Sequence, residues 1–510
     1  MLNRKFKPLI IVVSMVLLAA GFGCKKGTFD INSNNPNTPS SVDPKFILSA
    51  ALKSTATIFW GGDQEFANYY MGYWAVSGDY IPNSQTLTYN TTTGYFQDNW
   101  NSGYQILKNY QDVQTFGASY TNGANYVGIA MIMKAFMFQR LVDLYNNVPY
   151  FTALNATNLY PAYDNASAIY PSLVNQLDSA VAILKAAPTA ADNPGAYDMM
   201  FGGTMSKWQT FAKTLKLKIL LRLTQTTGGP AYIQSKLSGM TTADFIGAGA
   251  DANVNPGYTN ASGQQNPLWA DIGWGVTGTA TTNHDYYRAC TYGVNFYLNT
   301  NDPRASYFYA VNSANAVQGR AFGSTNSNAE HNATISAVGG NAVGGTVGQT
   351  TGVLKSPTMG VPLMTSTESL FLQAEAIQRG YLAGTLATVY QSAVSESFRI
   401  LGVPSYAAAA ATYTAQANNS CNITTTPNPL QTIILQKWAA LNTYDAVESW
   451  SDWRRLKIPS DLPVSVYPGT TATNVPYRLL YPATEYSYNA TNVNTQGTIN
   501  NLTSKIFWQP

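Results

Sequence analysis

Two short segments of the sequence place aromatic side chains next to polar ones. The first contains Tyr69, Tyr70, Tyr73, Trp74 and Tyr80. Flat aromatic rings stack on the apolar C–H faces of sugars, and amides, hydroxyls or guanidinium groups beside them bind the sugar hydroxyls. Tyr69, Tyr70 and Tyr73 repeat at near-helical spacing, which is typical of core packing. Trp74 suits either role, so Trp74 and Tyr80 are the candidate ligand contacts of this segment.

The second segment lies where helical periodicity is lost. It contains Trp269, Trp274, Tyr286, Tyr287 and Arg288. Exposed aromatic side chains in a loop are unusual without a binding partner, although a Trp can also anchor a loop to its scaffold. We therefore treat these residues as further candidate ligand contacts.

The sequence lacks the motifs that mark a catalytic centre. Its only histidines, His284 and His331, do not have metal-ligand spacing, and there is no nucleophile elbow, P-loop or dinucleotide motif. Glycoside hydrolysis needs two carboxylates about 5 to 10 Å apart, and no motif singles out such a pair. Residues 251–255 begin like a calcium loop, but Pro256 replaces its Gly and Ser262 its Glu. We predict no catalytic residue, cofactor or metal, and Ca²⁺ held by scattered carbonyls stays open.

Charge excludes one class of partner. Three of the 29 basic residues precede Cys24, so a chain that begins there balances its 26 acidic residues. Phosphate binding needs a basic surplus, which disfavours nucleic acid. Charged residues make up only 11% of the chain, against about a quarter in an average protein. A surface covered by amides and hydroxyls suits an uncharged ligand.

The N-terminus has the organisation of a lipoprotein signal peptide. Basic residues precede an apolar run over residues 9–22, and Gly23 then precedes Cys24. The run is too short to span a bilayer comfortably. We predict that residues 1–23 are removed and that acyl chains on Cys24 anchor the protein. Gly21 stands where the lipidation motif prefers Leu, Val or Ile, so a plain secreted protein with a free Cys24 is the alternative.

Two further cysteines, Cys290 and Cys421, lie far apart in the sequence and outside any CxxC-like context. An exported chain enters an oxidising compartment, where one disulfide between them is possible. Because neither lies in a motif that favours pairing, we predict that both thiols are unpaired.

The hydrophobic pattern predicts helices on both sides of an irregular centre. Helices are expected over residues 46–58, 97–116, 129–144, 166–186, 206–219, 366–379, 383–401 and 432–446. Neighbouring pairs predict a mainly α, single-domain scaffold, although the 34-residue tetratricopeptide consensus is not visible. Between about residues 228 and 362, Gly, Asn, Thr and Ala crowd together. Such a loop-rich insert is usually a functional surface.

Trp, Arg and Pro residues are concentrated near the C-terminus. They form the segments 436–438, 448–455 and 477–482, with Pro459 between the last two. Together with the collinear segments 30–39, 140–150 and 301–304, they resemble the SusD/RagB family, lipoproteins of Bacteroidetes-type bacteria that capture nutrients, usually glycans, at the outer-membrane surface. Within these segments we expect Trp438, Trp450 and Trp453 in the core and Arg454 and Arg455 in buried pairs.

The resemblance implies a tetratricopeptide-like helical scaffold over residues 24–510 and a non-enzymatic role in glycan binding, in the branch associated with starch. It also implies a SusC-like TonB-dependent transporter as partner, over which the lipid-anchored protein lies as a lid at the cell surface. Surface-exported lipoproteins often carry acidic residues after the lipidated Cys, whereas this chain has Lys25 and Lys26. A peptide-binding lid of the same family and a surface glycoside hydrolase are the alternatives.

Overall fold

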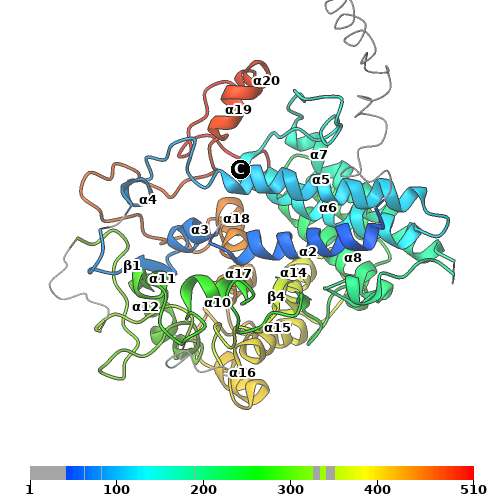
Figure 1. The fold of residues 1–510 in the computed structure, drawn as a ribbon. Helices are drawn as coiled ribbons and strands as arrows, with labels where there is room; N and C mark the ends of the chain where they lie inside the picture. The colour runs from blue at the N-terminus through cyan, green and yellow to red at the C-terminus, as the bar shows by residue number, and fades with distance from the viewer. Residues whose placement is uncertain (1–41, 63, 82, 189, 326–332, 341–350) are drawn as a thin grey trace, which may run out of the picture. The chain divides into compact units, whose positions relative to one another are not determined.

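Long helices that precede the irregular centre pack against one another in chain order. The computed structural model describes residues 42–62, 64–81, 83–188, 190–325, 333–340 and 351–510. The long helices are α2 (Pro44–Trp60), α5 (Asp98–Ser119), α6 (Ala124–Tyr145), α7 (Ala166–Ala186) and α8 (Met205–Arg222). Helices α5 to α8 contact their neighbours in sequence, and α2 packs on α5 and α6 (Figure 1).

A second set of helices follows the centre. It comprises α14 (Ser366–Gln378), α15 (Leu386–Leu401), α16 (Tyr406–Thr414), α17 (Pro429–Leu441) and α18 (Ala446–Leu456), and the short α19 (Ala483–Tyr488) and α20 (Ala490–Asn494) come last. Helix α14 contacts α15 and α17 and also α8 of the first set. Because the two sets share contacts, residues 44–510 form one compact unit. The mainly α, single-domain fold expected from the sequence is confirmed.

The sequence predicts the start of α14 correctly but misses the break between α17 and α18. Thr365 Oγ1 accepts a hydrogen bond from the Glu368 amide at 3.0 Å, which starts α14 at the expected position. The single helix expected over 432–446 is wrong, since α17 ends at Leu441 and α18 begins at Ala446. Thr443 adopts φ +67° there, and Asp445 Oδ1 caps α18 by accepting from the Glu448 amide at 3.0 Å.

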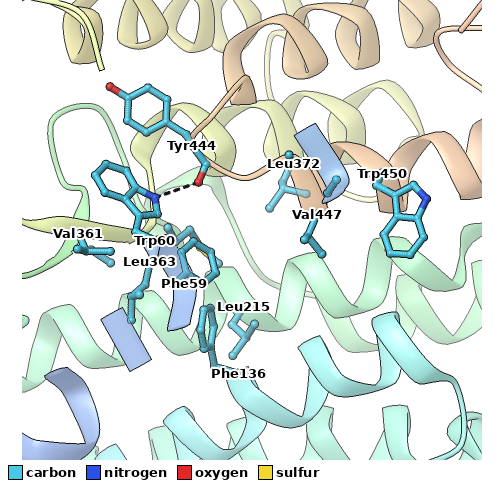
Figure 2. Close-up of a cluster of buried hydrophobic side chains, with 14 of the residues drawn as sticks. Phe59, Trp60, Phe136, Leu215, Val361, Leu363, Leu372, Tyr444, Val447 and Trp450 are labelled. Atoms are coloured by element: carbon cyan, nitrogen blue, oxygen red, sulfur yellow. Dashed lines mark hydrogen bonds between the residues drawn. The ribbon is translucent and has the colours of Figure 1, made fainter. Parts of the chain in front are cut away.

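The core lies around α2, which contacts α5 and α6 and also strand β4 (Val361–Met364). Figure 2 shows Phe59 of α2 facing Phe136 of α6, with ring centroids 5.9 Å apart. Beside them, the Trp60 indole nitrogen donates to the Tyr444 carbonyl at 3.3 Å (Figure 2). The predicted core residues Trp438, Trp450 and Trp453 are also buried. Burial of such large apolar side chains is the main force that holds the two sets of helices together.

Short elements occupy the irregular centre. They are α9 (Gly229–Leu237), β2 (Ala252–Val254), α10 (Pro267–Ile272), α11 (Thr282–Tyr286), β3 (Tyr287–Ala289), α12 (Thr291–Asn299) and α13 (Ala305–Phe308). Strand β2 pairs with β4, and β3 pairs with β1 (Trp74–Val76), both antiparallel. Near β1 lie α3 (Glu65–Tyr70) and α4 (Ser84–Thr88). These pairings fasten the centre to the helical scaffold.

The structure tests the prediction about the two cysteines but not the prediction about the N-terminus. Cys290 and Cys421 are buried and free, which confirms that they are unpaired, and burial raises the pKa of each thiol to about 11. The predicted signal peptide and Cys24 lie outside the described residues. Across the described part of the chain, no helix is both long and apolar enough to cross a membrane.

Candidate functional site

Strands β1 and β3 bring the two aromatic segments together. In their antiparallel register Trp74 lies opposite Ala289, and Val76 lies opposite Tyr287. The ring centroids of Trp74 and Tyr287 are 5.0 Å apart. The Tyr287 hydroxyl donates to Glu65 of α3, so that this ring is held from the scaffold side. Segments far apart in the sequence therefore form one cluster.

The outer edge of this cluster carries Tyr80 and Tyr286. The Ser77 amide donates to the Tyr286 carbonyl at 2.9 Å, which sets the loop after β1 beside α11. The two tyrosine rings then meet edge to face, with centroids 5.5 Å apart. Both side chains are half-buried, and Ile81 beside them is 96% exposed. We call Tyr80, Ile81 and Tyr286 the aromatic rim.

Polar groups flank the aromatic rim. Arg288 Nη1 donates to the His284 carbonyl at 2.6 Å, and Nη2 lies 3.7 Å from Asp285 Oδ1. Burial lowers the pKa of Arg288, while Asp285, Tyr80 and Asp79 act against that effect. Within the described residues Arg288 Nε has no hydrogen-bond partner. Apolar rings at the surface thus lie near the carboxylates of Asp79 and Asp285, and the Arg288 guanidinium is buried among these groups.

Trp269 and Trp274 form a second, buried cluster. The Asn266 side chain caps α10 by accepting from the Trp269 amide at 3.1 Å, and the two indoles lie 5.0 Å apart. Trp274 also packs at 4.7 Å from the His284 ring of α11. Their exposed fractions are 1% and 5%. Other side chains cover the faces of both indole rings. A ligand could contact Trp269 and Trp274 only if this segment opened, and their role in binding stays a prediction.

The candidates therefore differ in access, which sequence patterns do not report. Trp74, Tyr287 and Arg288 are also buried and lie beneath the rim. Sequence reasoning missed Ile81 and Asp285, which the structure places beside Tyr80 and Tyr286. No sequence signal marked Ile81, because Ile is among the residues that are most often buried and only the structure shows that this side chain is exposed.

A second group of side chains with chemical potential lies deep in the scaffold. Oxygens of Glu368, Asp445 and Glu448 approach within 4.8 Å of one another, the one such group of acids in the described part of the chain. The Lys218 Nζ lies 2.9, 3.5 and 3.0 Å from these three carboxylates. Its ammonium stands where a metal ion would, and burial leaves no room for substrate. We read this group as structural.

The C-terminal motif supplies further charges to this network. Arg455 Nη2 pairs with Glu375 at 2.7 Å and with Asp452 at 2.8 Å, which confirms its predicted role. Arg454 is buried as expected, but among the described residues its guanidinium donates to the backbone carbonyls of Asp143 and Tyr477 instead of pairing with a carboxylate. Lys437 lies 2.9 Å from Asp452 and also pairs with Glu448. Burial alone would raise the pKa of Glu448, but Arg222, Lys218 and Lys437 hold it well below its usual value. The C-terminal motif therefore joins α17, α18 and α14 through buried ion pairs.

Glu368 makes stability depend on pH. Burial raises its pKa from 4.5 to about 7, although Lys218 opposes the shift. The folded state then holds a proton that the unfolded state releases, so this stabilisation is complete below about pH 4.5 and is lost as pH rises through about 7. Between pH 5 and 8, we expect wild-type unfolding free energy to fall relative to Glu368→Gln by about 1–3 kcal/mol. Urea denaturation at both pH values measures this, and parallel profiles would contradict it.

Comparison with known proteins places this fold. A SusD homologue from Bacteroides fragilis superposes with a TM-score of 0.72 at 19% identity, over 92% of this chain and 99% of that one. A SusD-like protein from Bacteroides thetaiotaomicron gives 0.72 at 22% identity, over 92% and 99%. A chitin-binding SusD homologue from Flavobacterium johnsoniae gives 0.69 at 20% identity, over 91% and 98%. None of the curated proteins matches.

The fold is therefore that of the SusD homologues. The sequence itself matches the SusD-like family described as starch-binding and associating with the outer membrane, over residues 36–482. The chain belongs to this family, which confirms the resemblance found in its motifs. Members of the family bind carbohydrate and are generally non-catalytic.

Proposed function

We propose that this protein is a non-catalytic, lipid-anchored receptor at the cell surface that captures neutral glycans and passes them to a SusC-like TonB-dependent transporter. Family membership over residues 36–482 supports carbohydrate as the ligand class. The balanced charge and amide-rich composition favour an uncharged glycan. An acyl anchor on Cys24 would keep the receptor beside its transporter, which raises the effective concentration of captured ligand at the channel.

The observation that carries the proposal is the aromatic rim. Tyr80 and Tyr286 come from two segments that sequence analysis selected separately, and they meet at the surface with Ile81 beside them. A sugar ring can stack on the accessible part of either tyrosine ring while Asp79 or Asp285 binds its hydroxyls. Starch-type or chitin-type chains are the first ligands to test, because the matching family is described as starch-binding and two structurally similar proteins are chitin-binding proteins.

Replacing both rim tyrosines is expected to weaken glycan binding strongly. Each stacked ring is worth about 0.5–1.5 kcal/mol, so Tyr80→Ala with Tyr286→Ala should raise Kd about 5- to 150-fold. The measurement is calorimetric titration of a protein beginning at Lys25 with maltoheptaose and with chitohexaose. Tyr488→Ala, at a tyrosine that is 76% exposed on α19, is the matched control and should bind like wild type.

Other outcomes separate the alternatives. Binding of a peptide library together with no binding of either glycan would replace glycan by peptide as the cargo. Release of reducing ends from starch or chitin by the purified protein would replace the receptor with a glycoside hydrolase. Glycan binding that is equal in the rim variant and in Tyr488→Ala would move the site away from the rim.

A further inference from the structure

A cavity of about 650 Å³ lies between α12, α17 and the loop around residues 459–461. Pockets that bind small molecules range from about 300 to 1,000 Å³, so its volume suits a short oligosaccharide. None of its lining residues belongs to the aromatic rim or to the Trp269 cluster. It is therefore a separate feature of the irregular face.

One face of α12 builds the first wall of this cavity. Tyr292, Asn295, Phe296 and Asn299 all line it, at positions i, i+3, i+4 and i+7 of the helix. Residues with this spacing share one helix face. On most helices such a face is apolar and buried. Here aromatic and amide side chains alternate along it and face open space.

The aromatic part of the wall is held rigidly. The rings of Tyr292 and Phe296 meet the buried Trp438 indole edge to face, with centroids 5.7 and 5.0 Å away. The Tyr292 hydroxyl donates to Asp461 Oδ1 at 2.6 Å, which ties the loop around Pro459 to α12. A binding wall fixed before the ligand arrives loses less conformational entropy on binding.

The amides of the cavity are free to bind a ligand. Asn295 and Asn299 are exposed, and in the part of the chain that the structure describes neither side chain has a hydrogen-bond partner. On the opposite wall, the Asn418 side chain accepts from the Ser420 amide at 2.9 Å. Thr432 Oγ1 donates to the Asn419 carbonyl at 2.7 Å and so fixes the same turn to α17. Unpaired amides on rigid walls are suited to recognise hydroxyl groups.

The charge of the side chains that line the cavity narrows the class of ligand further. Among the residues that the structure describes, Asp461 is the one charged side chain that lines the cavity, and its carboxylate accepts the Tyr292 hydroxyl. The described lining therefore offers no cation to bind a carboxylate or a phosphate. The aromatic rings in the α12 wall match the apolar faces of a neutral sugar, and the amides of the cavity match its hydroxyls.

We infer that this cavity is a second binding site, distinct from the aromatic rim, for a neutral oligosaccharide of a few residues; the ligand class rests on the proposed function. Two sites on one chain hold a long glycan at two points, and the second contact then forms at a high effective concentration. A long chain gains affinity in this way, whereas a trisaccharide occupies each site independently.

The test uses maltotriose and triacetylchitotriose, the short forms of the two glycans named above. Calorimetric titration of a protein beginning at Lys25 should give two trisaccharides per chain. The double variant Asn295→Ala and Asn299→Ala should lose one of them, with a Kd raised about 10- to 100-fold at that site. Alanine favours helices, so this variant should fold. Asn494→Ala, at an exposed position on α20, is the matched control.

The outcomes separate the second site from the proposed function. Stoichiometry of one that is lost in the rim variant and unchanged in the α12 variant overturns the second site and leaves the rim as the glycan site. Binding that survives the rim variant and is lost in the α12 variant supports the cavity and overturns the rim. If neither trisaccharide binds wild type, both proposals fail.

Discussion

Lys218→Met should lower the free energy of unfolding by about 3–5 kcal/mol, the range for removing one partner of a buried ion pair. The Lys218 ammonium lies 2.9, 3.5 and 3.0 Å from Glu368, Asp445 and Glu448. Burial lowers the pKa of Lys218, but the three carboxylates outweigh it and the net direction is upward. Without this cation, closely spaced carboxylates remain buried with too few partners. Denaturation in urea at pH 7.5 measures the loss.

The chain offers a matched control. Lys108 pairs with Asp112 on the exposed side of α5, and its side chain is 45% exposed. Surface pairs contribute about 0–1 kcal/mol, so Lys108→Met, the same chemical change, should cost no more than that. Equal losses in the two variants would mean that the buried network contributes little to stability.

The Lys218→Met variant should also respond to pH in a specific direction. Loss of the ammonium raises the pKa of Glu368 further, because this carboxylate then has less positive charge nearby. The folded variant binds protons that the unfolded chain releases, so its stability falls as pH rises. We expect the deficit relative to wild type to be smaller at pH 5 than at pH 8. A deficit that grows on acidification would contradict this account.

Trp438→Ala should lower the free energy of unfolding by about 3–5 kcal/mol, as large aromatic truncations in cores do. The Trp438 indole stacks on Tyr73 at 5.1 Å, and its nitrogen donates to the Met71 carbonyl at 3.1 Å. It also supports Tyr292 and Phe296 of the cavity wall. One side chain thus joins α17, the segment before β1, and α12. Thermal or urea unfolding measures the effect.

Two control variants test the expected effect of Trp438→Ala. Trp438→Phe keeps a ring in the core and loses only the indole hydrogen bond and part of the volume, so it should cost less than the alanine variant. Tyr488→Ala removes an exposed ring and should change stability by no more than about 0.5 kcal/mol. A loss in Trp438→Ala no larger than in Tyr488→Ala would show that α12 and α17 do not depend on this contact.

Taken together, the buried network and the Trp438 cluster explain why the C-terminal motif is so dense in Trp, Arg and Lys. Glu448 and Arg455 interact with residues of α8 and α14. Lys437 joins α17 to α18 through Glu448 and Asp452, and Trp438 contacts α12. The motif joins the helical scaffold to the irregular face. A binding surface made of short elements needs such support, because each element by itself buries too little apolar area to hold its position.

The sequence by itself determined the helical scaffold and the family. Helix positions such as 166–186 and the cap at Thr365 follow from local periodicity and side-chain chemistry, and α7 and α14 form there. It missed the break between α17 and α18, because the positive φ of Thr443 is imposed by its tertiary surroundings and no Gly marks it. Local rules account for elements that local interactions stabilise.

Only the tertiary structure decided which aromatic side chains are accessible. Trp269 and Tyr286 have similar sequence surroundings, yet Trp269 is buried against Trp274 and Tyr286 reaches the surface beside Tyr80. The cavity on α12 also depends on α17 and the loop around Pro459, which lie far along the chain. Access is set by what distant segments cover, and pairings such as β1 with β3 form only when the whole chain has folded.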